Sequence, residues 1–198
     1  MPSAGHDAGI SMGAALFVQH EKLLQKRMTP IYSACTGTHY SNEQIKQTLH
    51  QHNIQFNEYK DEELFDVVTD YLIKGAVVGW MSGKSEFGPR ALGGRSILVD
   101  PRRKDAKQLL NDKIKRRENF RPFAPSILKE FVTDYFEVNE LSPFMERVLP
   151  IKKEKQSEIP AVSHIDGTGR LQTVAADISP RYYQLIETFR KKTGIPIL

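Results

Sequence analysis

Apolar and polar residues follow helical spacing in the first part of the chain. A turn-rich opening, residues 2–9, leads into a run with apolar residues at helical spacing over residues 10–24. Further on, Ser41 and Gln44 have the spacing of a capping box, which predicts a helix from there to about His52. The N-terminal quarter is therefore expected to contain two helices.

The middle of the chain changes from helical to strand-like patterning. Asp61 is expected to cap a third helix that ends at Gly75. The apolar runs of residues 76–81 and 96–99 predict two buried strands, and residues 105–114 predict another helix. The apolar face of that helix is expected to consist of Ala106, Leu109, Leu110 and Ile114.

Short strands and one long helix are expected in the C-terminal half. Residues 124–128, 161–163 and 171–175 are the predicted strands. A helix with Pro180 at its first position is expected to end at Gly194, after which a further strand begins. Helices interspersed with strands predict an α/β or α+β fold, in which helices flank a sheet.

Composition narrows the classes of protein that are possible. A chain of 198 residues is long enough for one domain with a small appendage, and 39% hydrophobic residues suit a globular core. No apolar run approaches the roughly 20 residues that span a bilayer, and no secretory leader is present at the start. The single cysteine, Cys35, excludes an internal disulfide framework and a cysteine-only zinc site. These features predict a cytoplasmic protein.

The densest chemical signal lies in residues 83–96, between two predicted strands. Four glycines and a proline there predict a tight, exposed backbone that can approach an anion. Arg90 and Arg95 suit forked hydrogen bonding to phosphate or carboxylate, and Lys84 adds a third cation. Glu86 could orient a guanidinium or bind an amide N–H. The alternative is a hairpin with solvated arginines at its rim.

A second basic cluster occupies residues 111–126. Arg116 and Arg117 are interpreted as a solvated helix end, while composition does not decide the role of Lys115. Arg121 is different, because rigid apolar residues surround it on both sides and suggest a positioned side chain. Those residues are Phe120, Pro122, Phe123 and Pro125.

The third cluster is a polar turn in residues 164–173, expected between two strands. His164 could be a general base or a phosphate ligand, although a lone histidine is more often structural. Arg170 is another forked donor where loop and strand meet. At the other end of the chain, Asp7 could cap a helix or supply one ligand of a metal site whose other ligands lie elsewhere.

These clusters together resemble the C-terminal part of the O-carbamoyltransferase family, which includes nodulation-factor and aminoglycoside carbamoyltransferases. The resemblance covers residues 75–198 and preserves the order of the motifs. The matching strings are Glu-Phe-Gly-Pro-Arg-Ala-Leu-Gly, Phe-Arg-Pro-Phe-Ala-Pro-Ser and His-Ile-Asp-Gly-Thr-Gly-Arg-Leu-Gln-Thr-Val, with Asp-Pro-Arg at 100–102 and Ser-Pro-Phe-Met at 142–145.

The resemblance implies a two-domain enzyme of which this chain is a part. An N-terminal actin-like ATPase-fold domain would hold iron and transfer the carbamoyl group to a hydroxyl-bearing acceptor. A C-terminal YrdC-like domain, a twisted mixed sheet flanked by helices, would make carbamoyl-adenylate from carbamoyl phosphate and ATP with Mg²⁺. Residues 1–40 would be the end of the first domain plus a linker, and residues 41–198 a truncated second domain. Asp7 matches the family's last metal-binding aspartate, so it would bind iron only in the intact enzyme.

The resemblance also assigns residues. Arg90, Lys115, Arg121 and Arg170 match the family's ligands for the substrate phosphates and the carbamoyl group. Further substrate-binding candidates are Lys84, Glu86, Arg95, Asn111, Ser126, His164 and Asp166. Two alternatives remain open: a basic concave face that binds double-stranded RNA or nucleotides without catalysis, and an inactive fragment that forms a homodimer through an exposed inter-domain surface.

Overall fold

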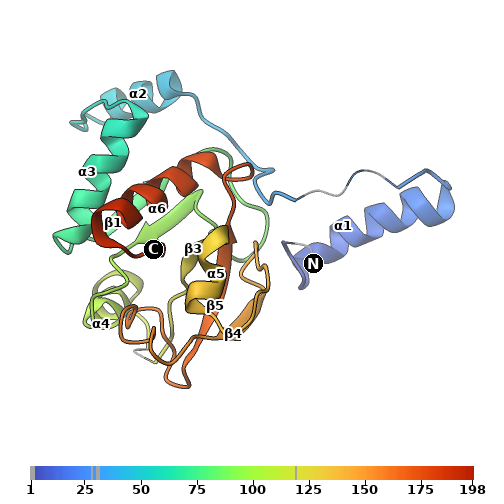
Figure 1. Cartoon of the computed structure of the whole chain (residues 1–198). Helices are drawn as coiled ribbons and strands as arrows, with labels where there is room; N and C mark the ends of the chain where they lie inside the picture. Colours follow the sequence, from blue (N-terminus) through green and yellow to red (C-terminus); the bar gives the residue numbers. More distant parts are fainter. Residues whose placement is uncertain (1–2, 28, 30–31, 119) are drawn as a thin grey trace.

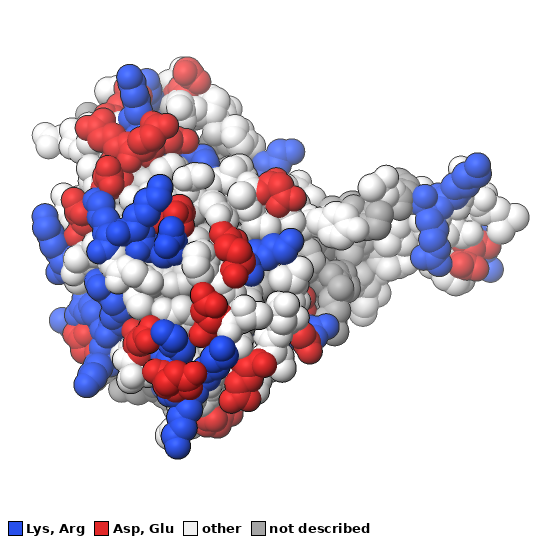
Figure 2. All heavy atoms as spheres, in the orientation of Figure 1, with Lys and Arg blue, Asp and Glu red and all other residues white. Residues whose placement is uncertain are grey.

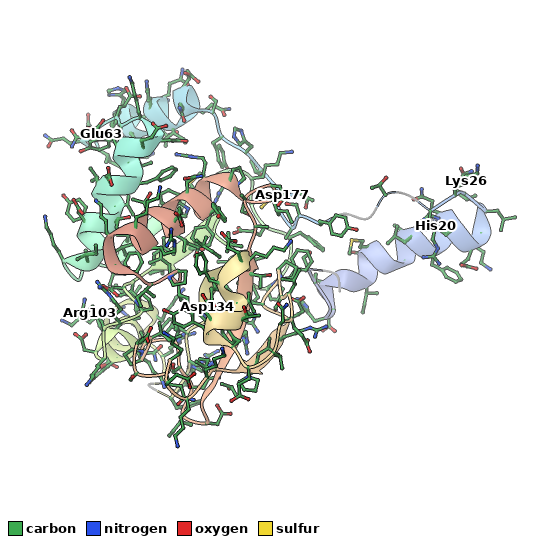
Figure 3. All side chains as sticks on the ribbon, viewed as in Figure 1. His20, Lys26, Glu63, Arg103, Asp134 and Asp177 are labelled. Carbon is green, nitrogen blue, oxygen red and sulfur yellow. The ribbon has the colours of Figure 1, made fainter. Side chains whose placement is uncertain are left out.

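An arm and a body make up the computed structural model, which describes residues 3–27, 29, 32–118 and 120–198. Helix α1 (Ala8–Phe17) continues into a π-helical segment, Val18–Lys22, and projects away from the rest of the molecule (Figure 1). Figure 3 shows His20 and Lys26 on this arm, far from Asp134 in the body. None of the described helices is both long enough and apolar enough to cross a membrane.

Two further helices follow the arm. Helix α2 (Asn42–Gln51) has the predicted capping box, in which the Ser41 hydroxyl accepts from the Gln44 N–H and the Gln44 side chain accepts from the Ser41 N–H. Helix α3 (Asp61–Ile73) begins at Asp61 itself, so the prediction of Asp61 as the cap is wrong. In the first turn its carboxylate favours the helix dipole without capping. Gly75, at φ +90°, ends α3 as predicted.

Strands β1 (Val78–Met81) and β2 (Arg95–Leu98) form an antiparallel hairpin. Both were expected to be buried, but only Trp80 in β1 and Leu98 in β2 are, while Met81 and Ile97 are exposed. The expectation of buried strands is therefore wrong for one face. A two-stranded hairpin has one face on the core, where Trp80 packs against Phe65 of α3, and its other face meets solvent.

A second, three-stranded sheet has the order β3–β5–β4. Strand β3 (Ser126–Leu128) is parallel to β5 (Thr168–Val174), and β4 (Arg147–Pro150) is antiparallel to β5. The chain end runs along the free side of β3, where Leu198 exchanges two backbone hydrogen bonds with Ser126 and Ile197 forms a bridge with Ile127. The strand expected after Gly194 is therefore confirmed as a short pairing.

The predicted strand at residues 161–163 is wrong. The N–H groups of Val162 and Ser163 both donate to the carbonyl of Ile159, which makes this segment a turn. The sequence patterns also did not predict β4, the 3-10 helix Lys129–Phe131 or α5 (Val132–Tyr135). Each is only three or four residues long, so neither alternation nor helical spacing has room to appear.

The predicted helix at residues 105–114 exists, but its winding changes. Helix α4 (Ala106–Leu109) passes into a π-helical segment, Leu110–Lys115. Ala106 and Leu110 are buried as expected, whereas Ile114 is 47% exposed. The wider π turn rotates later residues away from the face that a regular α-helix would present, so the predicted apolar face is wrong at Ile114.

Helix α6 (Pro180–Thr193) crosses the body and joins its parts (Figure 1). It begins at Pro180 and ends at Gly194, with φ +81°, as predicted. It runs parallel to α3, with Arg181 paired to Asp61 at one end and Lys192 to Asp70 at the other. One continuous core combines both sheets with α3, α4 and α6. The predicted α+β class with a mixed sheet is confirmed, while the domain boundaries at 1–40 and 41–198 stay a prediction.

Candidate functional site

Glu86 holds the glycine-rich loop between β1 and β2 in shape. Its Oε1 accepts hydrogen bonds from the backbone N–H groups of Leu92 at 2.9 Å, Gly94 at 2.6 Å and Arg95 at 3.3 Å. A Cβ at Gly94 would lie 2.8 Å from that oxygen, so a larger residue there would displace the Glu86 carboxylate from its hydrogen bonds. This carboxylate therefore binds amide N–H groups, which is one of the two roles that the sequence left open.

Arg95 also stabilises the glycine-rich loop through hydrogen bonds. Its guanidinium donates to the carbonyls of Ser82 at 3.2 Å, Gly83 at 3.2 Å and Gly94 at 2.7 Å. Those bonds close the base of the loop and saturate much of the donor capacity of the side chain. Direct substrate binding by Glu86 and Arg95 stays a prediction, and the contacts in this structure shape the loop that carries Arg90.

Arg90 and Arg170 lie close enough for their charges to interact. Partial desolvation lowers the pKa of Arg90, and the positive charge of Arg170 on β5 lowers it further. Neither guanidinium forms a hydrogen bond or an ion pair with any residue that the structure describes. Arginine keeps its proton at neutral pH, so two like charges stand together without a counterion. Such a pair is suited to a phosphate or carboxylate ligand.

Gln172 of β5 connects the loop that carries Arg90 to the strand that carries Arg170. Its buried side chain donates to the carbonyl of Leu92 at 2.8 Å and accepts from the Ser126 hydroxyl at 2.8 Å. Arg170 lies two residues before Gln172 on the same face of the strand, and Arg90 lies two residues before Leu92. The loop that carries Arg90 is therefore bonded to β5, the strand that carries Arg170. The same network engages Ser126, which was predicted to bind substrate.

Asn111 organises a second pair of arginines. This fully buried amide donates to the backbone carbonyl of Arg121 at 3.1 Å and accepts from Nε of Arg117 at 2.7 Å. The Arg117 guanidinium also lies 4.7 Å from the ring centre of Phe123, as in a cation–π contact. Arg117 is thus a positioned side chain, and its interpretation as part of a solvated helix end is wrong. In the sequence, the only signal for a positioned Arg117 is the aromatic residue Phe123, six residues later.

Arg121 lies in the segment that connects Arg117 to β3. Burial lowers the pKa of Arg117, and the charge of Arg121 lowers it further, which places the two guanidinium groups near each other. Arg121 is half-exposed, with Glu118 at 3.8 Å as its ion-pair partner. An open hollow of about 460 Å³ adjoins this region and is lined by Asn111, Asp112, Arg116, Arg117 and Glu118.

The second arginine pair precedes β3, and Arg170 lies in β5, the parallel neighbour of β3. Gln172 donates its N–H to the Pro125 carbonyl at 2.9 Å, so the segment between Arg121 and β3 enters the sheet next to the first half of β5, which bears Arg170. Lys115 is exposed at the end of the π-helical segment, and no contact among the described residues joins it to the other predicted phosphate ligands.

His164 is held in one tautomer by a short hydrogen-bond chain. Asp166 Oδ1 accepts from the Thr168 hydroxyl at 2.7 Å, and Thr168 Oγ1 lies 3.0 Å from His164 Nδ1. Because a carboxylate only accepts, the single hydroxyl hydrogen goes to Asp166, and Nδ1 must be the atom that donates to Thr168. Nε2 is then an unprotonated acceptor, and it is buried without a partner among the described residues.

Electrostatics keep His164 neutral. Burial lowers its pKa most, the opposing charge of Asp166 raises it, and the positive charges of Arg170 and Lys107 lower it again. The bonds from Thr168 in turn lower the pKa of Asp166. Near pH 7 the histidine is therefore an uncharged acceptor beside a cationic cluster, which suits either of its two predicted chemical roles.

Asp7 stands apart from this region, on the arm. It precedes α1 and is exposed, and its side chain makes no capping hydrogen bond, so its interpretation as a helix cap is wrong. Within the described part of the chain no group of three or more His, Cys, Asp and Glu side chains could hold a metal ion. Asp7 by itself therefore does not form an iron site.

Charges are mixed on the face shown in Figure 2. Lysine and arginine side chains lie among aspartate and glutamate over the body, so no continuous basic surface is seen from this side (Figure 2). Nucleic acid binding uses a continuous basic surface that follows the phosphate backbone. This face therefore does not favour the double-stranded RNA alternative.

Known proteins resemble the chain along most of its length. The model of the carbamoyltransferase C-terminus family matches residues 69–198. An uncharacterized protein of Synechocystis, sll1178, is 43% identical over 100% of this chain and 36% of its own length. The nodulation protein NolNO of Sinorhizobium fredii is 40% identical over 98% of this chain and 29% of its own. A nodulation protein U of Rhizobium fredii is 33% identical over 100% of this chain and 32% of its own.

The chain thus spans about a third of the length of the curated relatives that it matches. The family match includes both the loop that carries Arg90 and strand β5 that carries Arg170. It also includes the segment that positions Arg117 and Arg121. The chain belongs to the carbamoyltransferase C-terminus family.

Proposed function

We propose that this chain is the part of a carbamoyltransferase that forms carbamoyl-adenylate. Water would first cleave carbamoyl phosphate to carbamate and inorganic phosphate. A carbamate oxygen would then attack the α-phosphorus of MgATP, the bond from the α-phosphorus to the bridging oxygen would break, and pyrophosphate would leave. The products of the two steps are inorganic phosphate, carbamoyl-adenylate and magnesium pyrophosphate, so every atom of the two substrates and of the water is accounted for.

The uncompensated pair of Arg90 and Arg170 is the observation that supports this proposal. Every substrate and product in the sequence above carries phosphate or carboxylate oxygens. Phosphoryl and nucleotidyl transfer depend mainly on positioning and on neutralising developing charge. Two guanidinium groups without a counterion among the described residues provide both when a phosphate lies between them, and the bound anion would remove their mutual repulsion.

The second arginine pair would hold another phosphate group of the same reactants. Arg121 is the predicted ligand, and Arg117, fixed by Asn111 and Phe123, would assist it. Lys115, exposed at the end of the π-helical segment, would add a further cation to the bound phosphates. Lys84 would do the same from the glycine-rich loop.

The arm would contact another part of the longer enzyme. Its apolar side chains are exposed, among them Ile10 at 69%, Phe17 at 54% and Leu23 at 62%. Burying such a surface is favourable, and the relatives are about three times as long as this chain. We propose that the transferase domain of the longer protein covers the arm, binds iron with Asp7 and brings the hydroxyl acceptor. Dimerisation through the same surface would be seen instead as a concentration-dependent mass in analytical ultracentrifugation.

Calorimetric titration tests the proposed site directly. The 198-residue chain is expected to bind carbamoyl phosphate and magnesium pyrophosphate, and Arg90→Ala and Arg170→Ala are each expected to weaken binding strongly. Arg190→Ala is the matched control, because this arginine lies in the last turn of α6 and is paired with Glu187. Absence of binding to the unmodified chain, or an equal loss in the control, would reject the function. Release of pyrophosphate that depends on carbamoyl phosphate would then demonstrate the reaction.

A further inference from the structure

A short segment ahead of α2 pairs with the glycine-rich loop. The Gly37 N–H donates to the Ser85 carbonyl at 3.0 Å, and the Ser85 N–H donates to the carbonyl of the residue after Gly37, also at 3.0 Å. Further along the loop, the Phe87 N–H donates to the Ala34 carbonyl at 2.7 Å. These backbone bonds join residues 34–38, named the strap below, to the first part of the loop.

The strap fits the loop too closely to shift independently of it. A Cβ at Gly37 would lie 2.9 Å from the Cβ of Ser85 and 3.1 Å from the Ser85 carbonyl oxygen, which is closer than such atoms pack. Beside them, Ala34 is 4% exposed and belongs to a small apolar cluster that includes Leu92 of the loop. The strap therefore contacts the loop both before Arg90, at Ser85, and after it, at Leu92.

The other end of the arm meets the same loop. A Cβ at Gly88 would lie 2.6 Å from the carbonyl oxygen of Ser3, so the two backbones are in direct contact. The neighbouring Ala4 is 1% exposed. Figure 1 shows α1 projecting from the body after these residues and the chain at the body again ahead of α2. Both ends of the arm thus contact one loop.

Arg90 lies between these contacts. It follows Gly88 by two residues and precedes Leu92 by two. Pro89, which stands between Gly88 and Arg90, has a fixed φ and leaves the backbone little freedom to absorb a displacement. Because the Arg90 guanidinium has no acceptor among the described residues, its position depends on the backbone that carries it.

We propose that the strap and Ser3–Ala4 position Arg90 for its phosphate ligand. The proposal rests on the proposed function, in which Arg90 and Arg170 bind phosphate. A guanidinium that is held in place before binding loses less conformational entropy when the ligand arrives, so affinity depends on contacts that are remote from the ligand. Gly37 and Ala4 are then positioning residues, and neither touches the phosphate.

A pair of glycine variants tests the strap. Gly37→Ala adds a methyl group that collides with Ser85, whereas Gly79→Ala adds the same group where no atom lies within 4 Å. Neither glycine has a positive φ, so both substitutions act through contacts and not through backbone strain. In calorimetric titration of the full 198-residue chain, Gly37→Ala is expected to weaken magnesium pyrophosphate binding about tenfold, and Gly79→Ala to change it by less than about twofold.

Two double variants separate positioning from a general loss of structure. Gly37→Ala should weaken binding by no more than about twofold in a chain that already carries Arg90→Ala, because the effect of Gly37 runs through Arg90. Ser85→Gly removes the Cβ that the new methyl group meets, so Gly37→Ala combined with Ser85→Gly should bind within about threefold of the unmodified chain. An undiminished loss in the Arg90→Ala chain would overturn positioning through Arg90.

A pair of alanine variants tests the base of the arm. Ala4→Leu enlarges a side chain that is 1% exposed, whereas Ala15→Leu makes the same change at an exposed position on α1. Ala4→Leu is expected to weaken pyrophosphate binding at least about threefold, because the larger side chain displaces the loop, and Ala15→Leu is expected to leave it unchanged. Equal affinities in the two variants would overturn the role assigned to Ser3–Ala4.

Hydrogen exchange of the unmodified chain provides a measurement without a variant. Coupling between two sites is reciprocal, so a ligand that needs the strap in place must also hold it in place. Saturating magnesium pyrophosphate is expected to slow exchange of the peptide that contains Gly37 about tenfold, the same factor as the loss in Gly37→Ala, and to leave exchange in α2 unchanged. Unchanged exchange in the strap would overturn the proposal, also where Gly37→Ala fails to fold.

The outcomes distinguish the positioning from the proposed function. Pyrophosphate binding that is weakened by Arg90→Ala but not by Gly37→Ala would overturn the positioning and leave the proposed function intact. Absence of pyrophosphate binding to the unmodified chain would refute both.

Discussion

The arginines of this molecule divide into two groups that differ in what surrounds them. Arg95 and Arg102 are fully engaged by protein acceptors, the first by three loop carbonyls and the second by the carboxylate of Asp100. Arg90 and Arg170 instead lie near enough for their charges to interact, and neither has an acceptor among the described residues. Because an unpaired like-charge pair stabilises nothing in the free protein, this comparison separates arginines that build the fold from arginines that await a ligand.

The pair of Asp100 and Arg102 shows how the arginines with protein acceptors are bonded into the fold. Its carboxylate is 3% exposed and accepts from the Arg102 backbone N–H at 2.9 Å, from Nε at 2.9 Å and from Nη2 at 2.6 Å. The Arg102 guanidinium also lies 5.5 Å from the ring centre of Phe189 in α6. This pair links the segment after β2 to the core helix, and removal of one partner leaves the other charge uncompensated.

Removing the Asp100 carboxylate is the change with the largest expected effect. Asp100→Ala should lower the free energy of unfolding by about 3 kcal/mol, because it removes the buried acceptor of the Arg102 hydrogen bonds and leaves the partly exposed Arg102 charge uncompensated. Urea denaturation followed by circular dichroism measures this loss. Asp105→Ala is the matched control and should cost about 1 kcal/mol or less, since the Asp105 side chain is 64% exposed and its partner Arg103 also donates to the Gly75 carbonyl. Equal losses in the two variants would contradict the role assigned to Asp100.

Arg90→Ala and Arg170→Ala should show the opposite behaviour. Each is expected to weaken pyrophosphate binding about 100-fold, or about 2.8 kcal/mol, because each removes a charge-assisted contact to phosphate. The free energy of unfolding should stay within about 0.5 kcal/mol, since no described protein acceptor loses its partner. Calorimetric titration and urea denaturation of the same samples give both numbers. A large loss of stability with unchanged affinity would show that these two arginines stabilise the fold, as Arg95 and Arg102 do, and do not bind the ligand.

Glu86→Ala should combine the two kinds of effect. Loss of this acceptor leaves the N–H groups of Leu92, Gly94 and Arg95 unsatisfied in a partly buried loop, at an expected cost of about 2 kcal/mol. Pyrophosphate binding should weaken as well, because the loop that positions Arg90 loses its shape. Glu86→Gln, which keeps an acceptor oxygen, should recover most of the stability. No recovery would show that the negative charge matters more than the hydrogen bonds.

The smallest expected effect concerns pH and His164. Burial lowers the pKa of this histidine in the folded state, so the unfolded chain binds the proton more readily. Its contribution to stability is therefore full above the unfolded pKa of about 6.5 and is lost as pH falls through and below that value. Stability profiles from pH 8 to pH 5 should be flatter for His164→Asn, whose side-chain N–H₂ can still donate to Thr168. Parallel profiles would contradict this assignment.

Local chemistry was sufficient to predict several elements. The capping box of α2, the glycine that ends α3, and the proline and glycine that bound α6 each follow from the backbone preferences of one or two residues. The α+β class and the site motifs could be identified in the same way, because their residue types and order lie in contiguous segments. The resemblance to carbamoyltransferases depended on such segments and is confirmed by the family match.

Elements that depend on distant partners could not be predicted this way. Strand β4 is only four residues long and exists because it pairs with β5, and the segment at 161–163 is a turn although its composition resembles a strand. The exposure of Ile114 follows from a π-helical winding that no spacing rule reports. Arg117 likewise acquired its place from the buried amide of Asn111.

The amino-acid sequence by itself determined where helices begin and end, which residues are cationic, and the family to which the chain belongs. Only the tertiary structure decided which cations meet protein acceptors and which remain available. Twelve arginines are equivalent as side chains, and each acquires its role from the oxygen atoms that folding places within about 3 Å of it. Folding provides such oxygens around Arg95 and Arg102, while it brings Arg90 to Arg170 with no described acceptor between them.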